Sequence, residues 1–303
     1  MRVLITGGSG FIGENVAKGL RASNPEWRVR IFDIRPPDDG SLDLVKGDIF
    51  DRSAVDGVVE GSDLVYHMVG MKDAWRAQQD PLGSFRLNVQ SLAVVLESMR
   101  ANGVKRIVFP SSVALYSSIE TTAIPERTMP RPPNIYGWHK YMCEQLLQGY
   151  QINYGLDYLA FRLFNVYGPG TENVVSTFLS QAMDGRSIQG FGGKQYRDFV
   201  HVEDVVQALV KAATLEKGWN GPVNIGSGTG IMVEEVAGIA ASLFPGTTVA
   251  FTDKEGFVPN HLIADISLAR ELLGFTPVST RDKLVKTMGV MANALKEGRK
   301  PGR

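Results

Sequence analysis

The sequence predicts an α/β fold: a doubly wound parallel sheet with a smaller, interleaved C-terminal lobe. In the first half of the chain, short apolar segments alternate with longer amphipathic ones. A glycine-rich turn directly follows the first apolar segment, and beyond residue 165 glycine-punctuated loops loosen the pattern. Strands that alternate with helices need crossover connections, which give a parallel sheet covered on both faces.

The expected elements follow from apolar periodicity and from the position of glycine and proline. Strands are expected at 3–6, 28–33, 44–47, 63–68, 106–109 and 158–164. Helices are expected at 11–22, 53–60, 81–101 and 136–154, and in the later part near 174–183, 202–215, 233–243, 266–273 and 281–295.

Composition excludes several classes of partner. Lys+Arg and Asp+Glu both number 32 in 303 residues, so the formal net charge is zero. Nucleic-acid and membrane-surface binding need a sustained basic excess, and neither is expected. No apolar stretch approaches the roughly 20 residues that span a bilayer. The single cysteine, Cys143, cannot form an internal disulfide, and we expect a cytoplasmic protein.

A phosphate-binding turn is predicted where the first strand meets the first helix. Gly7, Gly10 and Gly13 form G-x-x-G-x-x-G there. Such a turn needs residues without a Cβ so that the backbone can approach a pyrophosphate, and the helix N-terminus offers N–H groups to that anion. The strand–turn–helix context indicates a Rossmann-type dinucleotide site.

Acidic residues after the next two strands complete the predicted cofactor site. Asp33 ends the second strand, where a carboxylate can accept hydrogen bonds from the adenosine ribose and repel a 2′-phosphate. NAD is therefore favoured over NADP, although Arg35 stands only two residues further on. Asp48 and Ile49 follow the third strand and are expected at the adenine edge.

A candidate catalytic group combines Tyr136, Lys140 and Ser112. Tyr136 and Lys140 are four residues apart, so they share one face of the predicted helix. An ammonium group beside a phenol is expected to lower the pKa of the tyrosine and make it a usable base. Ser112 follows the strand at 106–109, at the sheet edge where ligands bind in parallel sheets.

Several motifs together resemble the extended short-chain dehydrogenase/reductases, in particular the UDP-glucose 4-epimerase-like members of the NAD-dependent epimerase/dehydratase family. The resemblance covers nearly the whole chain in the right order. Its motifs are Thr6-Gly7-Gly8-Ser9-Gly10-Phe11-Ile12-Gly13, Ser111-Ser112-Val113-Ala114-Leu115-Tyr116, Tyr136-Gly137-Trp138-His139-Lys140, Arg162-Leu163-Phe164-Asn165-Val166-Tyr167-Gly168-Pro169, Arg197-Asp198-Phe199-Val200-His201, Asn224-Ile225-Gly226 and Ala264-Asp265-Ile266.

The resemblance implies roles for the matching residues. Tyr136 is expected to take the proton from a sugar hydroxyl, Lys140 to tune it and hold the nicotinamide ribose, and Ser112 to bind the same sugar oxygen. NAD is the implied cofactor, bound by Gly7, Gly10, Phe11, Ile12, Gly13, Asp33, Asp48 and Ile49 together with Tyr136 and Lys140. A nucleotide-sugar diphosphate is expected at Asn165, Arg197 and Lys254, of which only the arginine offers a fork.

The resemblance also predicts the organisation of the chain. Residues 1–165 are expected to form the NAD-binding Rossmann domain, joined by late elements around 196–216, and residues 166–303 to form mainly the substrate-binding lobe. Family members commonly dimerise through the helices at 81–101 and 136–154, so a homodimer is expected.

The residues after Ser112 narrow the reaction. Sugar dehydratases resemble this chain but carry an Asp-Glu pair there, whereas Val113 and Ala114 cannot exchange protons. The favoured function is therefore a nucleotide-sugar epimerase that oxidises its substrate and returns the hydride. A net oxidoreductase of the same fold and a non-catalytic NAD-sensing protein remain as alternatives. His139 and Cys143 have a metal-ligand spacing but no partner cluster, and no metal is expected.

Overall fold

A parallel seven-stranded sheet forms the centre of the molecule in the computed structural model, which describes residues 1–116, 123–252 and 260–298. Its strand order is β10-β6-β5-β4-β1-β2-β3. The strands are β1 Arg2–Thr6, β2 Arg28–Asp33, β3 Asp43–Lys46, β4 Leu64–His67, β5 Arg106–Ser112, β6 Asp157–Leu163 and β10 Gly221–Ile225. Because all neighbours pair in parallel, the predicted fold class is confirmed.

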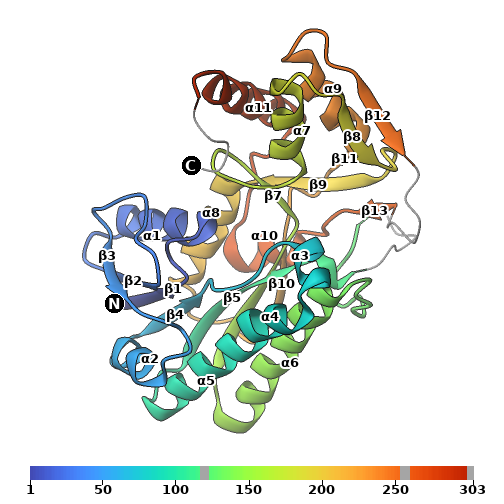
Figure 1. Cartoon of the computed structure of the whole chain (residues 1–303). Helices are drawn as coiled ribbons and strands as arrows, with labels where there is room; N and C mark the ends of the chain where they lie inside the picture. The colour runs from blue at the N-terminus through green and yellow to red at the C-terminus, as the bar shows by residue number, and fades with distance from the viewer. Residues whose placement is uncertain (117–122, 253–259, 299–303) are drawn as a thin grey trace.

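Helices cover both faces of this sheet, as Figure 1 shows. One face carries α1 Phe11–Ser23, α8 Val202–Ala212 and α10 Ser267–Leu273, and the other carries α2 Arg52–Val59, α5 Ser91–Ala101 and α6 Ile135–Tyr154. Side chains of alternate strand residues enter two separate cores: Ile5 packs with the first set of helices and Leu4 with the second. The alternation of one strand over two cores follows from the two-residue period of β-structure.

The single helix expected at 81–101 is divided in the structure. It consists of α4 Pro81–Phe85, a π-helical turn Arg86–Gln90, and α5. A shorter helix, α3 Ala74–Gln79, precedes it. A π-helical turn inserts one extra residue into the helical ladder and is frequent at functional sites. Here it contains Asn88, whose side chain is buried.

A second lobe packs around its own apolar core. Its four-stranded sheet contains β7 Asn165–Tyr167, β9 Tyr196–His201, β11 Gly230–Met232 and β13 His261–Leu262, and a two-stranded sheet pairs β8 Ile188–Phe191 with β12 Val249–Thr252. Three helices lie against these strands: α7 Val174–Met183, α9 Val233–Ser242 and α11 Arg281–Lys296. The helices agree with the sequence prediction, whereas none of these short strands was predicted.

Late segments of the chain belong to the central sheet and its covering helices as well as to the second lobe. Strand β10 and helices α8 and α10 come late in the sequence, yet they complete the central sheet and its first face. Of the segment 196–216, α8 packs on the central sheet, while β9 belongs to the second lobe. A domain boundary at residue 165 stays a prediction. Among the helices of the described residues, none is long and apolar enough to cross a membrane.

Candidate functional site

The glycine-rich turn closes tightly between β1 and α1. Gly7 has a positive φ of 71°, and a Cβ added there would lie 2.6 Å from the backbone nitrogen of Val69. A Cβ on Gly13 would lie 2.7 Å from the carbonyl oxygen of Gly7. Gly10 is the N-cap of α1 and offers no side-chain cap, so the first N–H groups of the helix face the turn. This geometry fits a bound pyrophosphate.

The predicted adenosine residues lie together at the carboxyl ends of β1, β2 and β3. Asp33 Oδ2 accepts a hydrogen bond from the Ser9 backbone N–H at 3.1 Å, which joins the end of β2 to the glycine-rich turn. The Gly47 backbone N–H donates to the carbonyl of Asp33 at 3.1 Å, so the next residues, Asp48 and Ile49, stand beside Asp33. Ile49 is buried, and Asp48 Oδ1 accepts from the Phe50 N–H.

The first residues of α1 connect this turn to other parts of the molecule. The ring of Phe11 lies against Gly170 in the loop after β7, because a Cβ on Gly170 would lie 3.3 Å from that ring. Ile12 packs on the core below the sheet. The turn is therefore covered on one side by a segment of the second lobe.

The candidate catalytic residues meet where β5 ends and α6 begins. The strand continues three residues beyond its predicted end at Phe109, so Ser112 is the last residue of β5. A short 3-10 helix, Val113–Leu115, follows and receives a cap from Ser112 Oγ, which accepts from the Ala114 N–H at 3.1 Å. The Asn134 side chain caps α6 at the Gly137 N–H, which fixes the start of the helix.

Tyr136 is buried in this corner, and the expected lowering of its pKa is wrong for the protein alone. Burial raises the pKa of Tyr136 to about 12, and a hydrogen bond with the Ser112 hydroxyl opposes this only in part. The reason lies in the position of the lysine. Lys140 Nζ is 6.0 Å from the centre of the Tyr136 ring and donates instead to the carbonyl oxygen of Pro110 at 2.8 Å.

Lys140 itself is an unusual lysine. It is only 5% exposed, and its Nζ lies 4.5 Å from the centre of the Phe109 ring. Burial lowers its pKa to about 8. A lysine with such a pKa in a corner that also holds a buried phenol is typical of a functional site.

The residues expected to bind a diphosphate lie on β7 and β9 of the second lobe. These strands pair in parallel, and Asn165 Nδ2 donates to the carbonyl oxygen of Asp198 at 3.2 Å. Arg197 is partly buried, donates to the carbonyl oxygen of Tyr196, and has its pKa lowered by burial to about 10, so it stays charged at neutral pH. Lys254 lies outside the described residues.

Comparison with known proteins identifies the family. Residues 3–226 match the family model described as "NAD dependent epimerase/dehydratase family". The chain belongs to this family. It is 31% identical to the UDP-glucose 4-epimerase of Azospirillum brasilense over 319 residues, which cover 94% of this chain and 90% of that protein.

Solved structures agree with the family over nearly the whole chain. MoeE5 in complex with UDP-glucuronic acid and NAD has a TM-score of 0.88 at 29% identity, covering 98% of this chain and 100% of that one. The UDP-N-acetylglucosamine 4-epimerase of Methanobrevibacter ruminantium M1 has a TM-score of 0.86 at 25% identity and covers 98% of both chains. The chain is thus an NAD-dependent enzyme of the extended short-chain dehydrogenase/reductase type.

An orphaned buried oxygen shows that the pocket fits the NAD of this family. Asn88 Oδ1 is buried and has no hydrogen-bond partner within the described residues. A Cβ on Gly70 would lie 2.7 Å from this oxygen and 3.6 Å from Lys140 Nζ, so both polar atoms flank Gly70. An unpaired buried acceptor is costly unless a ligand supplies a donor. A ribose hydroxyl of the cofactor, between Asn88 and Lys140, would supply it.

Asn88 was not predicted as a site residue. The segment 87–99 also contains Gln90, Ser91, Glu97 and Ser98, so one more polar residue gave no distinct signal. The orientation of the Asn88 side chain depends on two donations from Nδ2 to Ser84, at 3.0 Å to the carbonyl and 3.2 Å to Oγ. These use the amide hydrogens and leave Oδ1 facing Gly70.

No group of three His, Cys, Asp or Glu side chains that could hold a metal ion is found in residues 1–116, 123–252 and 260–298. The two residues with metal-ligand spacing have other partners. His139 Nδ1 is 2.9 Å from Ser84 Oγ, and Cys143 Sγ donates to the carbonyl oxygen of Asn88 at 3.4 Å. The first contact joins α6 to α4, and the second joins it to the π-helical turn Arg86–Gln90.

Proposed function

We propose that this protein is a nucleotide-sugar epimerase that oxidises a sugar hydroxyl and returns the hydride to the opposite face of the ring. The observation that carries the proposal is the corner of Ser112, Tyr136 and Lys140. It lies at the carboxyl edge of the sheet, on the same edge as the glycine-rich turn and separated from it by β4, and the next residues, Val113 and Ala114, have no group that could exchange a proton.

Each side chain of the corner has a task in this reaction. The Tyr136 oxygen takes the proton of the sugar hydroxyl as the alcohol becomes a ketone, and gives it back when the alcohol reforms. Ser112 donates a hydrogen bond to the same sugar oxygen. Lys140 and Asn88 would hold a ribose hydroxyl of the cofactor. When bound, NAD would supply the acceptor and donor of the hydride, and the positive charge of its nicotinamide would favour the Tyr136 phenolate that burial disfavours.

Return of the hydride, rather than elimination of water, is favoured because the two residues that follow Ser112 carry no acid or base. Loss of water needs an acid for the leaving hydroxyl and a base for the neighbouring carbon. Val113 and Ala114 supply neither, and the 3-10 helix that contains them packs on α6 at Gly137. A keto-sugar held here can rotate and be reduced, but these two residues provide no catalysis for the loss of water.

The substrate is proposed to be a UDP-hexose. Arg197 and Asn165 supply a guanidinium and an amide on adjacent strands, which suits a diphosphate. Relatives named for UDP-glucose and UDP-N-acetylglucosamine, and a neighbour solved with UDP-glucuronic acid, support the nucleotide and span three sugars. We take C4 epimerisation of UDP-galactose and UDP-glucose as the first reaction to test.

The test mixes purified protein with UDP-galactose without added NAD and follows UDP-glucose by chromatography. UDP-N-acetylglucosamine and UDP-glucuronic acid are assayed in parallel, and Tyr136→Phe is the control. We expect turnover of at least one sugar and a loss of about 10²- to 10⁴-fold in the variant, because a positioned acid–base residue contributes that much. Sugar-dependent accumulation of NADH without epimer would instead establish net oxidation.

A homodimer is proposed from the exposed face of α6. Trp138, Met142 and Ile152 are 45%, 43% and 70% exposed and recur along this helix, and Leu82 and Phe85 on the adjacent α4 are 77% and 40% exposed. Large apolar side chains gathered on two neighbouring helices suit a second copy of the same surface. Sedimentation equilibrium would show a monomer mass if this proposal is wrong.

A further inference from the structure

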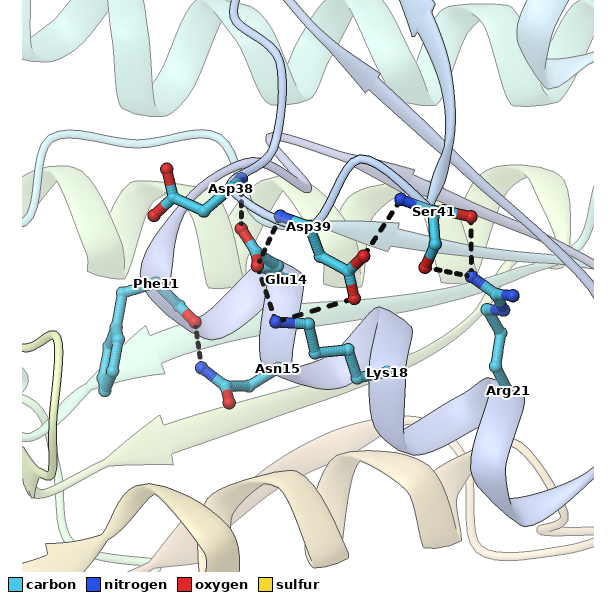
Figure 2. A network of polar contacts seen from close by, with 8 residues as sticks. All are labelled: Phe11, Glu14, Asn15, Lys18, Arg21, Asp38, Asp39 and Ser41. Atoms are coloured by element: carbon cyan, nitrogen blue, oxygen red, sulfur yellow. Dashed lines mark hydrogen bonds and ion pairs between the residues drawn. The ribbon is translucent and has the colours of Figure 1, made fainter. Parts of the chain in front are cut away.

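The segment that follows Asp33 is fastened to α1 over three successive helical turns. Glu14, Lys18 and Arg21 point from the helix toward residues 38–41, as Figure 2 shows. Positions spaced by four and three residues lie on one face of a helix. This segment begins at the predicted adenosine carboxylate, so its placement matters for the cofactor.

Glu14 makes the central contacts. Its residue is only 9% exposed, Oε2 accepts from the Asp38 backbone N–H at 2.9 Å, and Oε1 accepts from the Asp39 N–H at 3.2 Å. Lys18 Nζ donates to the same Oε1 at 2.7 Å and lies 3.9 Å from Asp39 Oδ2. A carboxylate that accepts backbone N–H groups forms charge-assisted hydrogen bonds, which are stronger than neutral ones.

Arg21 holds the far end of the segment. Its Nη1 donates to the carbonyl oxygen of Ser41 at 2.9 Å and lies 3.3 Å from Ser41 Oγ. Asp39 Oδ1 in turn accepts from the Ser41 N–H at 2.9 Å, which closes a turn within the segment. The fastening therefore involves backbone groups and does not depend on exposed side chains alone.

The near end is tied to the glycine-rich turn. Ser9 Oγ donates to the carbonyl oxygen of Arg35 at 2.7 Å, and the Arg35 N–H donates to Asp33 Oδ1 at 3.1 Å. Between the two ends stand Pro36 and Pro37, whose fixed φ limits movement. The backbone of Arg35 is thus held beside Asp33, where a 2′-phosphate of NADP would have to lie.

We infer that Glu14 is a positioning residue for cofactor selection: by fastening residues 38–39 to α1, it fixes the segment that follows Asp33 and keeps the Asp33 corner shaped for NAD. The inference rests on the assignment of this turn as the NAD site. A preorganised loop binds its ligand without the cost of ordering, so release of the loop weakens NAD. A released segment can also rearrange so that the Arg35 guanidinium pairs with a 2′-phosphate.

The experiment measures binding of NAD and of NADP separately by calorimetry, with protein stripped of cofactor and no sugar present. Glu14→Ala is expected to weaken NAD about tenfold, equivalent to about 1.4 kcal/mol, while NADP changes less than about twofold. Glu14→Gln should lie between, because its amide keeps one acceptor oxygen. Adding Arg35→Ala to Glu14→Ala should weaken NADP further and restore the preference for NAD.

The matched control is Asp56→Asn. Asp56 accepts from Arg52 Nε at 2.8 Å in another i,i+4 ion pair, on α2, but this pair is exposed and holds no segment at the cofactor turn. An unchanged ratio of NAD to NADP affinity in Glu14→Ala, or an equal change in Asp56→Asn, would overturn the inference. A lowered Tm with the ratio unchanged would show that Glu14 only stabilises the fold.

The outcome is independent of the sugar chemistry. Wild-type protein that selects NAD but converts no UDP-sugar would refute the proposed epimerase and leave the inference about Glu14 standing. Wild-type protein that binds neither dinucleotide would refute the cofactor site and the inference with it.

Discussion

Two buried cations near the corner of Ser112, Tyr136 and Lys140 have opposite electrostatic surroundings. Arg162 on β6 forms a bidentate pair with Glu144 on α6, with distances of 3.0 Å from Nε to Oε1 and 2.6 Å from Nη2 to Oε2. Lys140, one helical turn before Glu144, donates to a carbonyl oxygen and forms no ion pair within the described residues. Burial lowers the pKa of both groups, but Glu144 more than reverses this for Arg162.

This difference suggests that the Arg162–Glu144 pair has a structural role, whereas Lys140 is available to a ligand. The carboxylate of Glu144 also accepts from Ser111 Oγ at 2.5 Å, and Arg162 Nη1 donates to the Tyr116 hydroxyl at 2.6 Å. This network joins β5, β6 and α6 directly below the corner. Glu144 neutralises the charge of Arg162, whereas Lys140 has no such partner within the described residues and a pKa of about 8, near neutrality.

Breaking the Arg162–Glu144 pair should have the largest effect. Arg162→Leu leaves the Glu144 carboxylate buried without a cation, and we expect the free energy of unfolding to fall by about 3–5 kcal/mol. Urea denaturation measures this. The double variant Arg162→Leu/Glu144→Leu should recover much of the loss, because an apolar pair replaces the ionic one. A double variant as unstable as the single one would contradict the explanation.

The sequence predicted the elements of this corner, but not its electrostatics. Tyr136 and Lys140 share a helix face because of their spacing, and the glycines of the first turn are neighbours in the chain, so local patterns were sufficient. That Lys140 contacts Pro110 depends on how far β5 runs, which the segment 106–112 does not reveal by itself. The direction of the Tyr136 pKa depends on burial, which only the packed structure provides.

In the second lobe the helices were predicted from the sequence and the strands were not. Its helices have clear apolar periodicity and were predicted, but its strands are two to six residues long. They pair with distant segments: Gly230–Met232 lies on Tyr196–Asp198, and His261 lies beside Tyr196. Short strands with distant partners carry no local signal that distinguishes them from loops.

Lys140 is the buried cation without an ion pair in the described residues, and its removal should change how the free energy of unfolding depends on pH. The pKa of Lys140 is about 8 in the folded protein and near the ordinary value of 10.5 when unfolded. Below pH 8 the lysine is charged in both states, so folding carries the full cost of burying the charge. Between pH 8 and 10.5 the unfolded chain binds more protons, and stability therefore rises with pH.

We expect cofactor-free Lys140→Met to gain stability relative to wild type at pH 7, by up to about 3 kcal/mol, the equivalent of that pKa difference. The gain should shrink as the pH rises from 8 to 10.5, because the wild-type protein is then relieved of the charge. Denaturation of both proteins at pH 7, 8, 9 and 10 measures this. A difference that does not change with pH would show that Lys140 is not buried as an ammonium.

Asp198 on β9 is the anionic counterpart: it is buried, and within the described residues it forms hydrogen bonds but no ion pair. Oδ1 accepts from the Ser227 N–H and Oγ, and Oδ2 accepts from the N–H groups of Gly228 and Ala264. Burial raises its pKa, although these bonds oppose the rise. Asp198→Asn removes a buried charge, but it leaves some of these donors facing the amide nitrogen without an acceptor. We expect the second effect to be larger, so that the free energy of unfolding falls by about 1–2 kcal/mol at pH 7.

The pH dependence of that loss distinguishes Asp198 from an ordinary carboxylate. The pKa of Asp198 is higher in the folded than in the unfolded protein, so ionisation of Asp198 lowers the free energy of unfolding. As the pH falls from 7 toward 4, the wild-type protein should therefore gain stability relative to Asp198→Asn. Asp265 is the matched control, since its hydrogen bonds with Ser267 lower its pKa. The advantage of wild type over Asp265→Asn should stay unchanged from pH 7 to about 5 and shrink only as the pH falls toward and below 4. Parallel trends for the two variants would mean that the bonds around Asp198 outweigh its burial, and that the second lobe, like Arg162 and Glu144, fully compensates its buried charge.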